Sequence, residues 1–215
     1  MSDVSTGPNR PPILHDIAPD FVTRTTHGDR SLSSYRGRWL VFFSHPADFT
    51  PVCTSEFVAF AKAFSDFQRA DCDLLALSVD SLFAHLAWVR SIQTQFGIEI
   101  PFPIAEDAGM EIARAYGMVD QSARSSATVR ATFVIDPEGV IRAILWYPMT
   151  TGRNVAELLR LVHALQTSDQ HDVLTPEGWT SGTPVIEPIP ATSVEAARLA
   201  RLEGATDWYY RTKAL

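Results

Sequence analysis

Short apolar runs alternate along the chain with segments in which apolar residues recur every three or four positions. Residues 39–43 (WLVFF) form an uninterrupted apolar run, which is typical of a strand buried on both faces. After residue 53, phenylalanines recur at helical spacing up to residue 67 and predict a helix with one aromatic stripe. We interpret that stripe as core. The periodic part of the chain thus begins with a buried strand and a helix.

The same alternation continues through the next hundred residues. Further strands are predicted at 73–79, 131–135 and 140–147, and a short extended piece is predicted at 101–104. Further helices are predicted at 82–96, at 110–116 and from about 154, where Asn154 and Glu157 form a capping-box pair. Strands that alternate with helices and close in a hairpin predict an α/β fold, with a mixed sheet covered by helices on both faces.

The character of the chain changes near residue 167. Residues 168–192 contain four prolines and little periodicity, and a short helix then begins at Thr192 and stops near Gly204. This tail carries Trp179 and the aromatic run at 208–210, and such side chains are normally buried. They either cover a partner subunit or pack on their own chain. We predict a main domain over 1–167 and a C-terminal extension over 168–215.

Composition and charge exclude some classes of partner. Of the 215 residues, 46% are hydrophobic, and the formal net charge is −7 with scattered basic residues. This balance argues against nucleic acid and against an anionic membrane as partners. No apolar stretch approaches the length of a membrane helix, and residues 1–12 have no signal-peptide core. We therefore expect a cytoplasmic protein.

Of the two cysteines, Cys53 and Cys72, the first lies in a distinctive setting. Thr50 suits a helix N-cap and Pro51 the first helical position, so Cys53 falls in the first turn. Backbone N–H groups and the helix dipole favour negative charge there, and a thiol in this place is expected to ionise easily. A buried, unreactive cysteine fits the local pattern equally well.

The wider sequence carries a family resemblance. Pro46, Thr50 and Cys53 in the pattern P-x-x-x-T-x-x-C resemble the peroxidatic motif of the peroxiredoxins. The flanking residues are similar to the single-cysteine branch in particular, as are four further segments at 78–81, 85–88, 130–133 and 150–154. The resemblance implies a thioredoxin-like fold with a C-terminal extension. It also implies a thiol peroxidase that reduces hydrogen peroxide and organic hydroperoxides.

The resemblance implies roles for four residues. The Cys53 thiolate attacks one peroxide oxygen, which leaves Cys53 as a sulfenic acid. Thr50 supplies a hydroxyl, and the Arg130 guanidinium lies against the sulfur, so that both bind the peroxide. Pro46 shields the sulfur from bulk water.

Further residues are expected to support this site. His45 is a candidate to hydrogen-bond near it, and Arg153 either pairs with Glu56 or orients Arg130. His85 and His163 lie in helix patterns and are expected to have no chemical role. No metal-ligand spacing and no phosphate-binding loop occurs, so neither a metal nor a cofactor is expected.

The second cysteine decides the subtype. In two-cysteine relatives a resolving cysteine precedes a Pro-x-Gly-Trp stretch, and here Thr175 precedes that stretch at 176–179. Cys72 starts a predicted buried strand and is expected to be structural. The oxidised Cys53 is therefore expected to need an external thiol, either a small thiol or a thioredoxin-like protein. A phospholipase activity of some relatives is not expected, because Arg38 occupies the position of its serine.

Other functions use the same cysteine or the same fold. A peroxide sensor would pass its oxidation to a partner, and a chaperone would work without Cys53. A cysteine hydrolase would need a histidine, His45 or His85, beside the sulfur. The resemblance also implies a homodimer formed through the strand at 141–147, with the tails wrapping the partner. A decamer is an alternative assembly that the resemblance allows.

The first prediction concerns the oxidised protein. After treatment with peroxide, we expect mass spectrometry of the intact chain to find oxidation at Cys53 and no bond between the two cysteines, because Cys72 is expected in a buried strand. A Cys53–Cys72 disulfide would overturn the one-cysteine mechanism.

Overall fold

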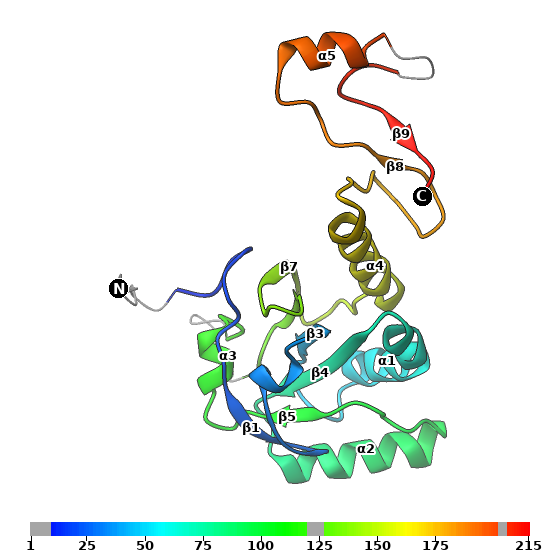
Figure 1. The fold of residues 1–215 in the computed structure, drawn as a ribbon. Coiled ribbons are helices and arrows are strands. Elements are labelled where there is room, and N and C mark those ends of the chain that lie inside the picture. The colour runs from blue at the N-terminus through cyan, green and yellow to red at the C-terminus, as the bar shows by residue number, and fades with distance from the viewer. Residues whose placement is uncertain (1–9, 120–126, 202–205) are drawn as a thin grey trace. The chain divides into compact units, whose positions relative to one another are not determined.

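The computed structural model describes residues 10–119, 127–201 and 206–215. The chain divides into two compact units, Met1–Val155 and Ala156–Leu215 (Figure 1). The first unit contains the large sheet, and the second contains most of helix α4 and the C-terminal segment.

The described part of the first unit is built on a sheet of seven strands in the order β2-β1-β5-β4-β3-β6-β7. Strands β3, β4 and β5 are parallel to one another, and all other neighbours are antiparallel. The sheet is therefore mixed, with β3 and β4 in its interior and β7 at one edge. The strands are β1 (Val22–Thr25), β2 (Gly28–Ser31), β3 (Trp39–Ser44), β4 (Cys72–Ser78), β5 (Ile104–Glu106), β6 (Arg130–Ile135) and β7 (Ile141–Tyr147).

Helices cover both faces of this sheet. Strand β3 is buried along its whole length, and its alternating side chains contact different helices. Phe43 stacks on Phe60 of α1 (Pro51–Arg69) with ring centroids 4.3 Å apart, whereas Phe42 packs against Tyr116, which follows α3 (Glu111–Ala115), at 5.0 Å. This two-sided burial explains the uninterrupted apolar run of the sequence.

Local signals fix where α2 (Leu82–Phe96) begins and ends. The hydroxyl of Ser81 accepts a hydrogen bond from the Ala84 amide, which satisfies one of the free N–H groups of the first turn. Gly97 adopts a left-handed conformation with φ +67° after the last turn, which glycine does without steric cost. Helix α2 packs beside α1, with Trp88 against Phe57 at 4.5 Å between ring centroids.

The second unit has a small core of its own. Trp179 is buried in a cluster with Ala164, Val173 and Val185, and its indole N–H donates to the Thr183 carbonyl. By contrast, the aromatic side chains at 208–210 are 40–55% exposed. Its elements are α4 (Val155–His171), β8 (Val185–Ile186), α5 (Ser193–Leu199) and β9 (Thr212–Lys213).

The predicted α/β fold with a mixed sheet is confirmed, and all the predicted strands and helices occur with ends shifted by a few residues. The short piece predicted at 101–104 is the strand at 104–106. Thr192 caps α5 as predicted, by accepting from the Glu195 amide, while the predicted end of this helix near Gly204 lies outside the described residues. The boundary at 167/168 stays a prediction.

The hairpin of β1 and β2 is not predicted by the sequence pattern. Its strands carry Thr, Arg, Asp and Ser and are largely exposed at the sheet edge, so the alternation that marks a half-buried strand is missing. Among the described residues, every helix is too short or too polar to span a lipid bilayer.

Candidate active site

Cys53 lies in the first turn of α1, where the carboxyl end of β3 leads into that helix. Thr50 occupies the N-cap position with φ −98° and ψ 147°, and Pro51 is the first helical residue. The Cys53 side chain is fully buried, with 0% exposure. The local signals thus place the sulfur at a helix N-terminus, within the protein and out of contact with bulk solvent.

Arg130 provides the positive charge at this sulfur. Its Nη1 donates to Cys53 Sγ at 3.3 Å and to Glu56 Oε2 at 2.8 Å. Its Nε and Nη2 donate to the Met149 carbonyl at 3.1 and 2.8 Å. Arg130 is itself 2% exposed, so the guanidinium is held in one orientation by three acceptors. A fixed positive charge in this buried place stabilises negative charge on the sulfur.

Glu56 joins the two buried arginines of the site. Its Oε2 accepts from Arg130 Nη1 and from Arg153 Nη2, both at 2.8 Å. Its Oε1 accepts from the Arg153 Nε at 2.9 Å and from the Arg153 amide at 2.8 Å. Burial raises the pKa of Glu56, but the hydrogen bonds and charge of Arg153 outweigh it and hold this pKa below its ordinary value. Glu56 is therefore a carboxylate that balances both guanidinium groups.

Arg153 is fixed by further contacts. Its Nη1 donates to the Ala131 carbonyl at 3.0 Å and to the Thr132 hydroxyl at 3.2 Å. Its guanidinium carbon lies 5.0 Å from the centre of the Phe43 ring, a distance at which a cation–π interaction is favourable. Strand β6 thus carries Arg130 directly and also holds Arg153, which in turn holds Glu56.

Thr50 and Pro46 lie in the loop before α1, where the Thr50 hydroxyl already has a hydrogen-bond partner. Its side chain makes no capping hydrogen bond, because its hydroxyl donates to the Ala47 carbonyl at 2.9 Å. Because the hydroxyl proton is already donated to Ala47, the Thr50 oxygen can only accept a hydrogen bond from a substrate. Pro46 is buried, and its shielding of the sulfur stays a prediction.

His45 belongs to a buried hydrogen-bonded cluster centred on Asp48. His45 Nε2 lies 2.8 Å from Asp48 Oδ1, and His85 Nδ1 of α2 lies 2.7 Å from Asp48 Oδ2. Burial lowers the pKa of His45 despite the opposing effect of Asp48. Burial also raises the pKa of Asp48, but its two histidine partners outweigh this and hold that pKa below its ordinary value. The cluster is a carboxylate held between two imidazoles.

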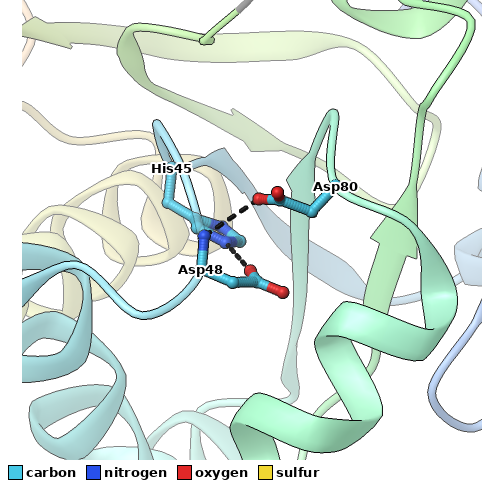
Figure 2. A group of neighbouring side chains, drawn as sticks. All are labelled: His45, Asp48 and Asp80. Atoms are coloured by element: carbon cyan, nitrogen blue, oxygen red, sulfur yellow. Dashed lines mark hydrogen bonds and ion pairs between the residues drawn. The ribbon is translucent and has the colours of Figure 1, made fainter.

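Asp80 completes this cluster from the loop between β4 and α2. Its Oδ2 accepts from the Asp48 amide and from the Ser78 hydroxyl, both at 2.9 Å; Figure 2 shows Asp48 bonded to His45 through its side chain and to Asp80 through its backbone. Ligand atoms of His45, Asp48 and Asp80 lie within 4.8 Å of one another, a spacing that could hold a cation. Hydrogen bonds already engage all three groups, so we describe them as a hydrogen-bonded network.

An apolar pocket of about 610 Å³ opens beside Thr50. It lies between α1 and α2 and is lined by Phe49, Pro51, Val58, Trp88 and Phe96 among others. Its walls are mostly carbon, so the pocket suits an apolar group better than a charged one.

The structure brings Arg130 and Arg153 to Cys53 and Glu56, although both arginines lie far from α1 in sequence. Sequence reasoning missed Asp48, Asp80 and the Met149 carbonyl. It also gave His85 no role, because a histidine in a helix pattern is usually structural. One signal was available, since His85 and Trp88 are three residues apart and therefore share a face of α2.

Comparisons with known proteins identify the family of the chain. The model of the AhpC/TSA family matches residues 14–144, and the model of the C-terminal domain of 1-Cys peroxiredoxin matches residues 164–204. Peroxiredoxin 2 of Caldanaerobacter subterraneus subsp. tengcongensis is 50% identical over 195 residues, which cover 89% of this chain and 88% of the relative. The chain belongs to the peroxiredoxin family. It is therefore a thiol peroxidase, and its C-terminal match is to the single-cysteine members.

Two more relatives support the assignment to the peroxiredoxins. The peroxiredoxin of Aquifex aeolicus is 49% identical over 210 residues, which cover 92% of this chain and 95% of the relative. The solved structure of a yeast mitochondrial 1-Cys peroxiredoxin superposes with a TM-score of 0.84 at 36% identity, and covers 94% of this chain and 99% of that one. The predicted thioredoxin-like fold of this peroxiredoxin is thus confirmed.

The second prediction tests the balance of charge in this peroxiredoxin. Glu56→Gln is expected to lower the free energy of unfolding by about 3–5 kcal/mol, because it leaves two buried guanidinium groups without a counter-charge. Chemical denaturation at pH 7 measures this change. Glu138→Gln, at an exposed turn position, is the matched control and is expected to change stability by less than about 0.5 kcal/mol.

The difference in stability between the wild type and Glu56→Gln is expected to depend on pH. The pKa of Glu56 is lower in the folded protein than its ordinary value of 4.5. Its contribution to the free energy of unfolding is therefore complete above pH 4.5 and is lost as the pH falls through the folded-state pKa. The stability gap between wild type and Glu56→Gln should therefore shrink in acid. A gap that stays constant down to pH 2 would contradict this role of the ionised carboxylate.

Proposed function

We propose that Cys53 is the residue that reduces the peroxide in this peroxiredoxin. The observation that carries the proposal is the 3.3 Å hydrogen bond from Arg130 Nη1 to Cys53 Sγ at the start of a helix. A thiolate is the reactive form of cysteine, and the charge of Arg130 together with the helix dipole favours negative charge at that sulfur. Cys72 has no comparable surroundings, since burial raises the pKa of its thiol.

In the proposed reaction the Cys53 thiolate attacks one oxygen of the peroxide. A sulfur–oxygen bond forms while the oxygen–oxygen bond breaks, and the second oxygen leaves as hydroxide or alkoxide and takes up a proton. The sulfur is oxidised by two electrons to a sulfenic acid, and the peroxide is reduced to water or an alcohol. The reaction needs no metal or cofactor, because sulfur supplies both electrons.

Arg130 and Thr50 are proposed to bind the peroxide. Arg130 Nη1 already lies at the sulfur and can stabilise charge that develops on the oxygens during attack. Thr50 is proposed to accept a hydrogen bond from the peroxide O–H, since its own proton is committed to Ala47. Arg153 and Glu56 hold Arg130 in place, and His45 supports the loop. The apolar pocket beside Thr50 is proposed to receive the organic part of a hydroperoxide.

An external thiol is proposed to reduce the sulfenic acid. It would attack the Cys53 sulfur, release water and form a mixed disulfide, which a second thiol then reduces. Thr175 stands where two-cysteine relatives carry a resolving cysteine, and Cys72 is fully buried. The yeast 1-Cys relative is described as resolved through glutathione and thioredoxin systems, and we propose a reductant of the same two classes here.

We further propose that the protein forms a homodimer and works in the cytoplasm. Strand β7 forms an edge of the sheet and pairs with β6 along one side. On its other side, His15 and Asp16 bond to Ile141 at the start of the strand, and the rest of that edge can accept a strand from a second chain. Trp146 on this strand is 47% exposed, which gives such a contact an apolar anchor. The compartment rests on both cysteines being free thiols.

The third prediction assigns the reaction to one cysteine. Cys53→Ser is expected to reduce peroxide consumption to the background rate, whereas Cys72→Ser should retain it within about twofold, because only the first has the charge environment for attack. Consumption of hydrogen peroxide is measured with glutathione, thioredoxin and dithiothreitol as reductants, and circular dichroism checks the fold of each variant. Turnover retained in a folded Cys53→Ser protein would contradict the assignment of the reaction to Cys53.

The fourth prediction concerns assembly. Size-exclusion chromatography with light scattering is expected to give twice the mass of one chain, and Trp146→Glu is expected to lower that mass to one chain by placing a charge at the paired edge. A wild-type protein that elutes as a monomer would contradict the dimer, and a mass ten times that of the chain would show the decamer.

A further inference from the structure

The burial of Cys53 poses a problem for its reduction. The side chain is 0% exposed in the folded site, so a thiol carried by a peptide or protein cannot contact the sulfur while the first turn of α1 is in place. Opening must therefore precede reduction. The rate at which an external thiol acts then depends on the contacts that hold this turn and the loop before it.

Hydrogen bonds of Asp48, five residues before Cys53, hold the loop before α1 in place. Its carboxylate accepts from His45 at the end of β3 and from His85 on α2, while its amide donates to Asp80. All three contacts are short, at 2.7–2.9 Å, and both histidines are fully buried. Of these partners, His85 is the one that connects the loop to a neighbouring helix.

The protonation of this cluster follows from its geometry. An ionised carboxylate only accepts hydrogen bonds, so His45 must present Nε2–H and His85 must present Nδ1–H to Asp48. The other ring nitrogens, His45 Nδ1 and His85 Nε2, are buried without a partner. Neither ring therefore has an alternative hydrogen bond in the described structure, and both are committed to Asp48.

Helix α2 makes a second attachment on the other side of Cys53. Trp88 Nε1 donates to the Thr54 hydroxyl at 3.3 Å, and that hydroxyl donates to the Thr50 carbonyl at 2.8 Å. Because His85 and Trp88 are three residues apart, one face of α2 holds the chain both before and after the reactive cysteine.

The loop also contains local strain. Phe49, between Asp48 and Thr50, has φ +57°, a left-handed conformation that is unfavourable for a residue with a large side chain. Such a conformation persists only where its surroundings hold it. Releasing Asp48 would therefore let Phe49 relax and favour the open loop.

We propose that His85 is a positioning residue of this peroxiredoxin: through Asp48 it attaches the loop before α1 (residues 45–50) to α2 and thereby sets how readily the Cys53 sulfur becomes exposed to its reductant. The inference rests on the proposed function of Cys53. His85 contacts Asp48 rather than the sulfur, so it acts on the population of the closed site and leaves the attack on peroxide to Cys53 and Arg130. A weaker hydrogen bond between His85 and Asp48 speeds reduction of the sulfenic acid, and a stronger one slows it.

The test separates the two half-reactions by stopped-flow kinetics. In His85→Leu the side chain keeps a similar bulk but loses its hydrogen-bond donor. A hydrogen bond to a charged group is worth about a tenfold change in an equilibrium, so reduction of the oxidised Cys53 by glutathione should become about tenfold faster. Oxidation by hydrogen peroxide should slow by less than about twofold, because the closed form still predominates. General damage to the site would instead slow oxidation and leave reduction no faster.

Two variants serve as controls. His85→Asn places an amide N–H near the position of Nδ1, so it should restore both rates to within about threefold of the wild type. His171→Leu removes an exposed histidine in α4 and should change neither rate. Reduction of His85→Leu at the wild-type rate would overturn the proposal while leaving the role of Cys53 intact, whereas oxidation that persists in Cys53→Ser would overturn the proposed function itself.

A measurement on the wild type keeps the proposal testable if His85→Leu does not fold. The amides of Asp48 and Thr54 donate to Asp80 and to the Thr50 carbonyl, one on each side of Cys53. If the loop and the first turn open as one unit, native-state hydrogen exchange should give both amides the same opening free energy. Exchange at Thr54 more than about tenfold faster than at Asp48 would show that the turn opens without releasing the loop, and would overturn the proposal.

Discussion

The site depends on one carboxylate between two buried guanidinium groups. Glu56 neutralises Arg130 and Arg153 in a region from which water is excluded, and this pairing lets a positive charge stand 3.3 Å from the Cys53 sulfur. Two like charges this deep in a protein would be strongly unfavourable without it. Since Glu56 follows Cys53 by three residues on α1, the same helical turn carries the sulfur and the counter-charge of the guanidinium beside it.

The aromatic packing of α1 places that turn against the sheet. Phe57 and Phe60 lie against Phe43 of β3, and β6, the antiparallel neighbour of β3, begins with Arg130. The Met149 carbonyl beyond β7 then fixes the far side of the Arg130 guanidinium. The surroundings of the Cys53 sulfur are thus set by elements that also form the core, so changes in core packing will alter those surroundings.

The loop before α1 meets a different requirement. In the proposed reaction, peroxide is attacked in the closed arrangement around Cys53, whereas the proposed external thiol needs the sulfur exposed. Attachments to α2 through Asp48 and Thr54 hold the closed form, while the left-handed Phe49 opposes it. Under the proposed mechanism, the balance between these hydrogen bonds and the local strain would let one cysteine serve both half-reactions.

The sequence by itself determined the strand–helix order and the helix start at Cys53, because periodicity, capping residues and proline act locally. With the family motif it also pointed to Arg130 and Glu56. It did not reveal the polar hairpin of β1 and β2, the proton of Thr50 bonded to Ala47, or the joining of Asp48 to His85. Those features follow from contacts between segments distant in sequence or from a choice among competing acceptors. Only the tertiary structure decides them, because a hydrogen-bond partner is selected by position in space.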